Sequence, residues 1–245
     1  MKVIVVASGK GGTGKTSFIA GTASALAISG HKVLMIDGDI GLRNLDIALG
    51  MSDQLVFSFA DVAKGMIPLE RAAACHRQIP GLWLLTAPVT SEDVAKEGLQ
   101  NIVQQAAALG FAYIFVDCPA GIGEGFTEFS SIATHGVIVS TPERAGLRGA
   151  ERTARMMEKL GVSNLRLVLN RVRKRLIFRG MVSDLDAAMD ETGLPLLGVI
   201  PEDEDVIACF NSGISIIGRK KDGASWAFRN IARRLEGNQV ALMKL

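Results

Sequence analysis

Two lysines and two threonines stand in a glycine-rich stretch near the start of the sequence, and their spacing suits phosphate binding. The stretch is Gly9-Lys10-Gly11-Gly12-Thr13-Gly14-Lys15-Thr16, which matches G-x-x-x-x-G-K-[ST]. Its glycines let the backbone curl so that several N–H groups point at phosphate oxygens. Lys15 would reach the β- and γ-phosphates of a nucleotide, and the hydroxyl of Thr16 would ligate Mg²⁺. We therefore predict a nucleotide-binding loop from Gly9 to Thr16, with Ser17 next to it also at the nucleotide and the positive end of a helix dipole at the phosphates.

Carboxylates follow two of the apolar segments that come after this loop. Asp37 and Asp39 come after one such segment, and Asp117 comes after another. Carboxylates this close together repel one another unless a cation or a water network lies between them. Asp117 has the position of a Walker B residue, which holds Mg²⁺ directly or through water, whereas Asp46 fits a helix cap equally well. The predicted metal ligands are Thr16, Asp37, Asp39 and Asp117.

These residues need a scaffold that brings them together, and the apolar pattern indicates which one. Short apolar runs that do not alternate with polar residues are typical of strands buried on both faces of a parallel sheet. Longer segments with helical spacing lie between them. We therefore expect an α/β fold with a doubly wound, mostly parallel sheet and helices on both faces, as in P-loop NTPases, with ligands at the carboxyl ends of the strands. The expected strands are Val3–Ala7, Lys32–Ile36, Leu82–Thr86, Tyr113–Val116, Gly136–Ser140, Leu165–Leu169 and Leu196–Ile200, and the expected helices are Lys15–Ser29, Ser91–Leu109, Glu143–Leu160, Met181–Thr192 and Ala224–Leu235.

Composition places the chain among globular proteins. Apolar residues make up 48% and charged residues 21% of the 245 residues, which excludes a disordered chain, and the net charge of +2 gives no bulk field that favours nucleic acid or membrane. The three cysteines include no C-x-x-C pair, which argues against structural zinc, an iron–sulfur cluster and a disulfide framework. The first apolar run is too short for a signal peptide or a membrane span, so a cytoplasmic protein is expected. We expect one ATPase domain over residues 1–237 and a short apolar tail over residues 238–245.

Three motifs resemble those of one family. The loop with Lys10 as a second lysine, the run D-G-D-I-G-L-R-N-L-D from Asp37, and the run D-C-P-A-G-I from Asp117 resemble the deviant Walker motif and the two switches of the MinD and ParA ATPases. The resemblance covers most of the chain, and the first switch favours the MinD branch. It implies that Lys10, otherwise a solvated charge on a loop tip, reaches across a nucleotide-sandwiched dimer to the partner's phosphates. It also implies that Asp39 positions the attacking water and Asp37 supports the Mg²⁺ shell, so the expected catalytic residues are Lys10, Lys15 and Asp39.

The resemblance also assigns residues to the base. Asn170, after the expected strand that ends at Leu169, would bond the adenine edge, with Arg171 beside it. The loop Pro201-Glu202-Asp203 would cover the ring. From the residues alone, an asparagine after a strand is more often a turn residue.

The family's activity sets the expected function. The resemblance implies an ATPase that binds ATP or ADP with Mg²⁺, is a monomer with ADP and a homodimer with ATP, and regulates where the division septum forms. Hydrolysis is expected to be slow until an activating protein completes the site, and an effector protein is expected to bind as well. The second switch departs from the family at Gly123, where an acidic residue is expected and Glu124 comes one place later. The contacts of this switch with partners are therefore open.

Three other functions stay open. A ParA-type partition ATPase would bind DNA nonspecifically through Arg171-Val172-Arg173-Lys174-Arg175 and Arg179, but these residues also suit a solvated face, anionic lipid or an acidic partner, and DNA is not favoured. A metallocentre-insertion ATPase is disfavoured by the missing C-x-x-C pair. A small-molecule kinase would need an acceptor pocket, for which the sequence has no signature.

The C-terminal region offers one membrane contact. Apolar residues share one face of the expected helix 224–235, and we favour packing of this face against the core. The tail after Gly237 carries several apolar side chains and the single cation Lys244. Burying about three of them gives about 5 kcal/mol before ordering costs. Two tails on an ATP dimer would therefore bind an anionic membrane surface only weakly, through avidity, and give a peripheral place on the inner face of the cell membrane.

Overall fold

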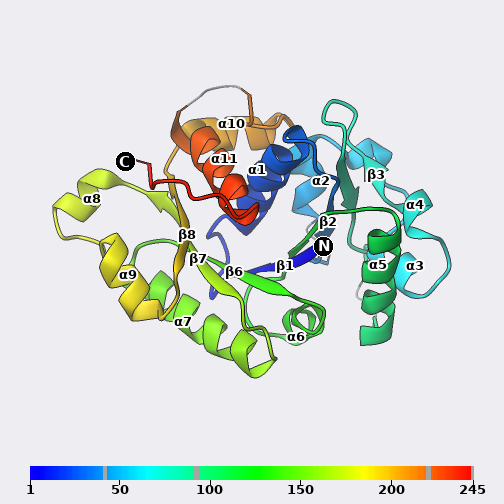
Figure 1. The fold of residues 1–245 in the computed structure, drawn as a ribbon, viewed down its shortest axis with the longest axis horizontal. Coiled ribbons are helices and arrows are strands. Elements are labelled where there is room, and N and C mark those ends of the chain that lie inside the picture. The colour runs from blue at the N-terminus through cyan, green and yellow to red at the C-terminus, as the bar shows by residue number, and fades with distance from the viewer. Residues whose placement is uncertain (41–42, 91–93, 219–221, 244–245) are drawn as a thin grey trace.

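The architecture comes from a computed structural model, which describes residues 1–40, 43–90, 94–218 and 222–243. Within these residues, eight strands form one sheet in the order β3-β4-β2-β5-β1-β6-β7-β8 (Figure 1). Neighbouring strands are parallel except for β3, which pairs antiparallel with β4 at the edge. The strands are β1 (Lys2–Ala7), β2 (Val33–Asp37), β3 (Ala74–Cys75), β4 (Leu82–Leu85), β5 (Tyr113–Asp117), β6 (His135–Ser140), β7 (Leu165–Val172) and β8 (Leu196–Pro201).

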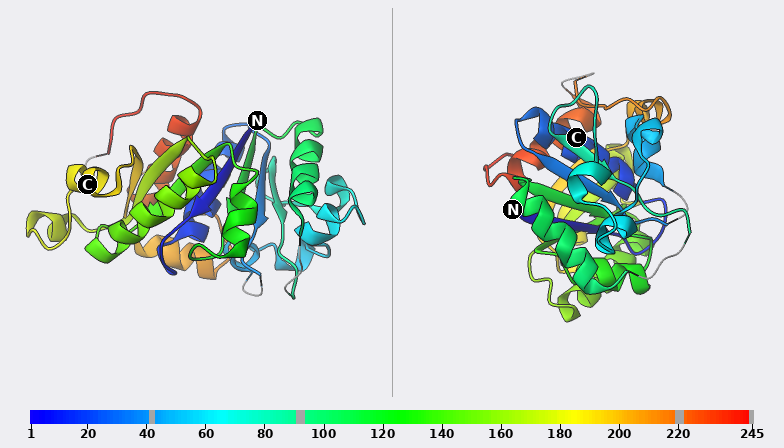
Figure 2. Two further views of the ribbon diagram at one scale, coloured as in Figure 1. Left: turned by 90° about the horizontal axis from the view of Figure 1, so that it is seen from below. Right: turned by 90° about the vertical axis from the view of Figure 1, so that its right-hand side faces the viewer.

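Helices cover both faces of this sheet (Figures 1 and 2). On one face lie α1, α2, α10 and α11, and on the other lie α5, α6, α7 and α9. The predicted α/β fold with a doubly wound, mostly parallel sheet is confirmed. The helices are α1 (Lys15–Ile28), α2 (Asn44–Leu49), the 3₁₀ turn η1 (Ser52–Gln54), α3 (Phe59–Ala63), α4 (Leu69–Ala72), α5 (Lys96–Ala108), α6 (Glu124–Ser130), α7 (Arg144–Lys159), α8 (Lys174–Phe178), α9 (Leu185–Thr192), α10 (Glu204–Asn211) and α11 (Gly223–Leu235).

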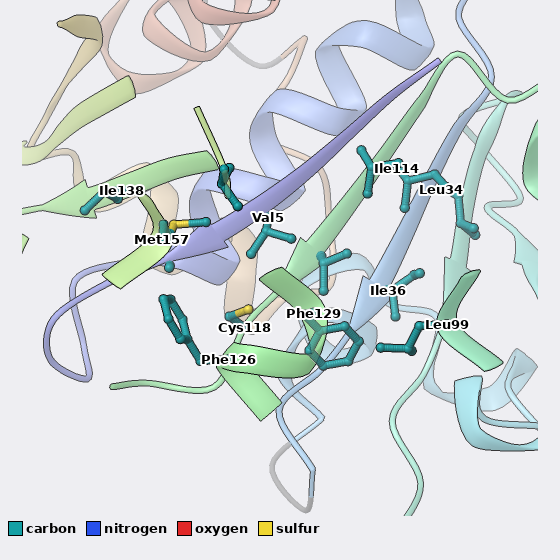
Figure 3. Close-up of a cluster of buried hydrophobic side chains, with 14 of the residues drawn as sticks. Val5, Leu34, Ile36, Leu99, Ile114, Cys118, Phe126, Phe129, Ile138 and Met157 are labelled. Carbon is teal, nitrogen blue, oxygen red and sulfur yellow. The ribbon is translucent and has the colours of Figure 1, made fainter. Parts of the chain in front are cut away.

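Strand β1 shows how the core is divided between the two faces. Val3 and Val5 belong to the buried cluster that includes side chains of α5, α6 and α7, while Ile4 and Val6 belong to the cluster that includes α1 and α11. Successive side chains of a strand point to opposite faces, so an unbroken apolar run is buried on both sides. Figure 3 shows part of the first cluster, where Phe126 of α6 lies under the sheet beside β1.

The seven expected strands are all present, and most of their ends agree to within a residue. One strand is longer than predicted, because β7 continues past Leu169 to Val172 through an irregularity in its pairing with β8. Asn170 therefore lies inside a strand and not after one, which corrects the prediction. A bulge of this kind bends the strand and re-aims its side chains.

Two expected helices begin later than predicted. The helix expected from Met181 begins at Leu185, because the carboxylate of Asp184 accepts a 2.8 Å hydrogen bond from the N–H of Ala187 and caps it there. The helix expected from Ser91 begins at Lys96, and residues 91–93 lie outside the described residues. The sequence pattern does not predict α2, α3, α4, α6, α8, α10 or β3. Each has eight residues or fewer, so tertiary contacts and not its own periodicity stabilise it.

Helix α11 packs against the core, as favoured from its apolar face, and Phe228 at its centre is 1% exposed. The tail then lies beside the helix. The guanidinium of Arg234 donates hydrogen bonds to the carbonyls of Val240 at 2.9 Å and Ala241 at 3.0 Å, and to that of Leu197 in β8 at 2.9 Å. The tail forms no helix over residues 238–243, and residues 244 and 245 lie outside the described part. In the described residues, no helix is both long enough and apolar enough to cross a membrane.

Candidate nucleotide site

The glycine-rich loop joins β1 to α1 at the carboxyl edge of the sheet. Gly14 precedes α1 with a φ of 93°, a left-handed conformation that glycine adopts without strain. Behind the loop, the buried hydroxyl of Ser8 donates to the carbonyl of Lys10 at 2.8 Å and accepts from Nζ of Lys15 at 3.2 Å. The ammonium group of Lys15 is thus held near the start of α1, where free N–H groups favour an anion. Sequence reasoning missed Ser8, although a hydroxyl between an apolar strand and a phosphate loop is a usable signal.

Thr16, near the start of α1, contacts Asp117, the last residue of β5. The hydroxyl of Thr16 donates to Oδ2 of Asp117 at 2.6 Å, whereas the buried Oδ1 has no hydrogen-bond partner in the described residues. Burial raises the pKa of Asp117 to about 7, against the lowering effect of the hydrogen bond from Thr16. A buried carboxylate oxygen without a partner, beside a hydroxyl, fits Mg²⁺ and its bound waters.

Asp37 ends β2 in register with Asp117, and its carboxylate shapes the loop that follows. Its Oδ1 accepts from the N–H of Asp39 and its Oδ2 from that of Leu45, both at 3.0 Å. Burial raises the pKa of Asp37 to about 6, the two backbone hydrogen bonds oppose this rise, and the charge of Asp39 adds to it. Asp39 is half-buried and lines the cavity beside the phosphate loop.

The carboxylates do not form a metal cage by themselves. Among the described residues, no group of three or more His, Cys, Asp or Glu side chains is arranged to hold a metal ion. Mg²⁺ usually keeps several waters and binds through one or two carboxylates together with substrate phosphates. The geometry is therefore compatible with a cation that arrives with a nucleotide, held by the hydroxyl of Thr16 and the carboxylate of Asp117.

The other wall of the site comes from the ends of β7 and β8. Nδ2 of the buried Asn170 donates to the carbonyl of Thr13 at 2.8 Å, so this amide supports the phosphate loop. The next residue, Arg171, has a left-handed φ of 56° and lines the cavity. Arg173 and Glu202 form an ion pair that joins the ends of the two strands. The pKa of Glu202 lies below its usual value because Arg173 donates a hydrogen bond to its carboxylate.

Asp203 holds the starts of two helices. Its Oδ1 accepts from the N–H of Asp205 at 3.0 Å, and its Oδ2 from that of Ala224 in α11 at 2.9 Å. The carboxylate of Asp203 thus connects the loop 201–203 to the starts of α10 and α11. Helix α10 also adds an apolar wall to the site, which sequence reasoning missed. The signal for this wall was three apolar residues at positions i, i+1 and i+4, shortly after the Pro201-Glu202-Asp203 run. The side chains of this wall are Val206, Ile207 and Phe210.

A cavity of about 530 Å³ lies between these walls, a size typical of small-molecule sites. A larger hollow of about 1010 Å³ lies at the amino ends of the strands, near the start of β2. Its lining contains none of the predicted site residues. Among the predicted residues, the lining of the smaller cavity contains Gly11, Gly12, Gly14, Lys15, Thr16, Ser17, Asp39, Asn170, Arg171, Pro201, Glu202 and Asp203. Its lining does not include Gly9, the exposed Lys10, or the buried Thr13, Asp37 and Asp117.

Comparison with known proteins agrees with this geometry. The family model described as the CobQ/CobB/MinD/ParA nucleotide binding domain matches residues 4–216. The chain belongs to the MinD/ParA family. It is 38% identical to the septum site-determining protein MinD of Bacillus subtilis over 248 residues, covering 100% of this chain and 92% of that protein.

Solved structures of MinD proteins have the same fold. MinD in the MinC:MinD complex of Aquifex aeolicus superposes with a TM-score of 0.94 at 36% identity, covering 100% of this chain and 99% of that one. MinD of Pyrococcus horikoshii, whose structure holds Mg-ADP, superposes with a TM-score of 0.84 at 29% identity, covering 96% of each chain. MinD/ParA proteins are P-loop ATPases, and this chain is one of them. The prediction of an adenine nucleotide and Mg²⁺ as cofactors is confirmed at the level of the family.

Proposed function

We propose that this chain is a MinD-type ATPase that hydrolyses ATP slowly, is a monomer with ADP and a homodimer with ATP, and thereby helps to place the division septum. One observation carries the proposal. The cavity beside the glycine-rich loop is lined by Lys15, Thr16 and Asp39, in a chain that is 38% identical along its whole length to a septum site-determining protein. The ATPase domain would comprise residues 1–237, and residues 238–245 would form a separate tail.

Within the site, we assign a role to each residue that approaches the phosphates. Lys15 binds the β- and γ-phosphates, since Ser8 holds its ammonium group near the N-terminus of α1. Thr16 and Asp117 hold Mg²⁺, which offsets charge on the transferred phosphoryl group. Asp37 orders the loop that carries Asp39 through its two backbone hydrogen bonds. Asp39 lines the cavity, and among the described residues no side chain or N–H group hydrogen-bonds to its carboxylate, which suits a group that positions the attacking water.

Lys10 is assigned to the partner copy in the dimer. It is exposed, and it stands outside the lining of its own cavity, whereas Lys15 already serves the phosphates there. The bond from Ser8 to the carbonyl of Lys10 holds the backbone of the loop and leaves the ammonium group outside. A cation in this position can neutralise charge on a nucleotide bound by a second chain, as an arginine finger does in other NTPases.

The base would lie between α10 and the ends of β7 and β8. Phe210 and its neighbours on α10 supply an apolar surface for a ring, and Pro201 and Glu202 line the same end of the cavity. Asn170 lines the same cavity, but its amide already donates to the carbonyl of Thr13. We therefore assign Asn170 mainly to holding the phosphate loop in place. Contact with the adenine edge is its secondary role.

The partners follow from the same assignment. The MinD of Aquifex aeolicus was solved in a complex with MinC, which supports an effector protein as a partner here. The exposed Gly123 and Glu124 lie in the second switch, where an activating protein could act. We place the protein in the cytoplasm, with a weak peripheral attachment to the anionic inner face of the cell membrane.

A fluorescent fusion, followed in cells of the source organism, tests this function. The wild-type fusion should show a non-uniform distribution related to the division site, and the Lys15→Ala fusion should be diffuse. Purified protein should in parallel hydrolyse ATP and elute as a dimer only with ATP and Mg²⁺. A uniform distribution of both fusions, or ATP turnover without any ATP-dependent dimer, would contradict the proposal.

A further inference from the structure

Helix α8 and the three residues after it project from the outer end of the sheet, beyond β8 (Figures 1 and 2). We call residues 174–181 the α8 tip. Two large apolar side chains of the tip are exposed, Phe178 to 78% and Met181 to 66%. The nucleotide site uses neither of them.

The backbone holds these two side chains outward. The N–H of Met181 donates to the carbonyl of Leu176 at 3.0 Å, and the N–H of Gly180 donates to that of Ile177 at 2.9 Å. Gly180 has a φ of 62°, so the helix ends in a Schellman motif. Leu176 and Ile177 are half-buried, and Ile177 packs against the core. The tip is therefore anchored by its inner side chains, while its outer side chains face solvent.

Positive charge surrounds the exposed apolar pair. Residues 171–183 contain five basic residues and no acidic residue. Arg173 pairs with Glu202, but Arg175 and Arg179 form no ion pair with any carboxylate of the described residues. The ammonium group of Lys174 lies 5.6 Å from the ring centre of Phe178. A cation and an exposed apolar ring are therefore neighbours within one turn of helix.

We propose that the α8 tip binds an anionic lipid bilayer, with Arg175 and Arg179 at the lipid phosphates and Phe178 and Met181 at the boundary of the acyl chains. Interfacial binding needs this combination of cations and adjacent apolar side chains. A nucleic acid would match the cations, but a single projecting turn is too short to follow a phosphate backbone, and Met181 has no ring to stack on a base. The acidic residues that begin at Asp184 limit the contact to the tip.

The tail is a weaker candidate for the same contact. Arg234 holds the carbonyls of Val240 and Ala241 against the body of the protein, and the tail forms no helix over residues 238–243. The proposal rests on the membrane attachment proposed above, and it moves the contact from the tail to α8. It does not depend on the assignments at the phosphate site.

Flotation of the full-length protein with vesicles tests the contact. The vesicles contain phosphatidylcholine alone or a mixture with phosphatidylglycerol, and the protein carries ATP and Mg²⁺. The wild type should float with the anionic vesicles only, and less so at high salt. Each cation near an anionic surface strengthens binding about fivefold, so Arg175→Gln with Arg179→Gln should weaken binding at least about tenfold. Phe178→Ser with Met181→Ser should weaken it to a similar extent.

Matched control variants separate a local contact from a general effect. Arg71→Gln with Arg77→Gln removes two exposed charges, and Val56→Ser with Met66→Ser removes two side chains that are 83% and 74% exposed. Both controls should float like the wild type, and all four double variants should keep wild-type ATP turnover. Turnover and ATP-dependent dimerisation report on the proposed function separately from flotation.

Several outcomes would overturn the inference. These are equal flotation with uncharged vesicles, no flotation of the wild type, equal losses in the control variants, or undiminished binding of both α8 variants. Loss of flotation after deletion of residues 238–245 with unchanged flotation of the α8 variants would assign the contact to the tail instead. Salt-sensitive binding of double-stranded DNA that needs Arg175 and Arg179, without vesicle binding, would assign the tip to nucleic acid.

Discussion

The hydroxyl of Thr16 donates a 2.6 Å hydrogen bond to Oδ2 of Asp117 and so connects the start of α1 to the end of β5. This bond leaves Oδ1 of Asp117 buried and without a partner in the described residues. A buried, ionised carboxylate without a hydrogen-bond partner lowers the free energy of unfolding. The protonated, uncharged form of the same group lowers it less. The same pair of residues therefore links metal binding, pH and stability.

The nucleotide-free protein should lose stability as the pH rises from about 4 to about 7. Burial raises the pKa of Asp37 to about 6 and that of Asp117 to about 7, from 3.8 in both cases. Between these values the folded protein binds more protons than the unfolded chain, so the free energy of unfolding falls as pH rises, by up to about 1.4 kcal/mol per pH unit for each extra proton. Below about pH 4 both states are protonated, and the contribution is constant.

Urea unfolding of the protein in EDTA, measured across this pH range, checks the prediction. Asp117→Asn removes one titrating group, so its stability should fall less steeply with pH than that of the wild type. Adding ATP and Mg²⁺ should flatten the slope of the wild type, because the cation favours the ionised carboxylates. Identical slopes for the wild type and Asp117→Asn would exclude Asp117 as a source of the pH dependence.

Lys15→Ala should abolish nucleotide binding, whereas Lys10→Ala should not. Ser8 accepts a hydrogen bond from Lys15, which lines the cavity, while Lys10 is exposed and outside the cavity lining. Lys10→Ala should keep its ATP affinity within about tenfold, or about 1.4 kcal/mol, but lose ATP-driven dimerisation or turnover. Isothermal titration and size-exclusion chromatography measure the two effects. If both variants fail to bind ATP, Lys10 acts within its own site.

Asp39→Ala should accumulate as an ATP-bound dimer. Asp39 lines the cavity, but the contacts that we propose to hold nucleotide belong to Lys15 and Thr16, so the substitution should slow hydrolysis without loss of binding. Size-exclusion chromatography with ATP and Mg²⁺ should show a dimer that persists for longer than that of the wild type. A monomer that hydrolyses ATP at the normal rate would show that Asp39 does not position the water.

The phosphate half of the site could be predicted from sequence because each of its residues stands in a recognisable local pattern. Gly9 to Thr16 follow one strand in an unbroken run, and Asp37 and Asp117 end two neighbouring strands. The sequence pattern therefore indicates both which residues form the site and where in the fold they lie. The base half depends on contacts between distant parts of the chain. Asp203 holds Ala224, 21 residues later, and Asn170 holds Thr13, 157 residues earlier. No local pattern indicates such partners, and the irregular pairing of β7 that places Asn170 inside a strand has no local signal either.

Asn170→Asp should weaken ATP and GTP binding by similar factors. The amide donates to the carbonyl of Thr13, and a carboxylate cannot replace this donor. Loss of this buried hydrogen bond, together with repulsion between the carboxylate and the carbonyl, costs about 1–3 kcal/mol, or roughly fivefold to 150-fold in affinity. Isothermal titration with both nucleotides measures the effect. A loss confined to ATP would show that Asn170 reads the adenine edge and does not mainly support the loop.

Arg234→Ala should destabilise the protein more than deletion of residues 238–245 does. The guanidinium donates to Val240 and Ala241 in the tail, but also to the carbonyl of Leu197 in β8. The deletion leaves the bond to Leu197 in place, whereas the substitution removes it and leaves a carbonyl of a buried residue without that donor. We expect a loss of about 1–3 kcal/mol for Arg234→Ala and less than about 1 kcal/mol for the deletion, measured by urea unfolding. Arg234→Ala should also let carboxypeptidase trim the tail faster, because Arg234 is the hydrogen-bond donor to the carbonyls of Val240 and Ala241 among the described residues. Equal destabilisation by the two changes would mean that Arg234 serves the tail alone, and unchanged trimming would mean that it does not hold the tail.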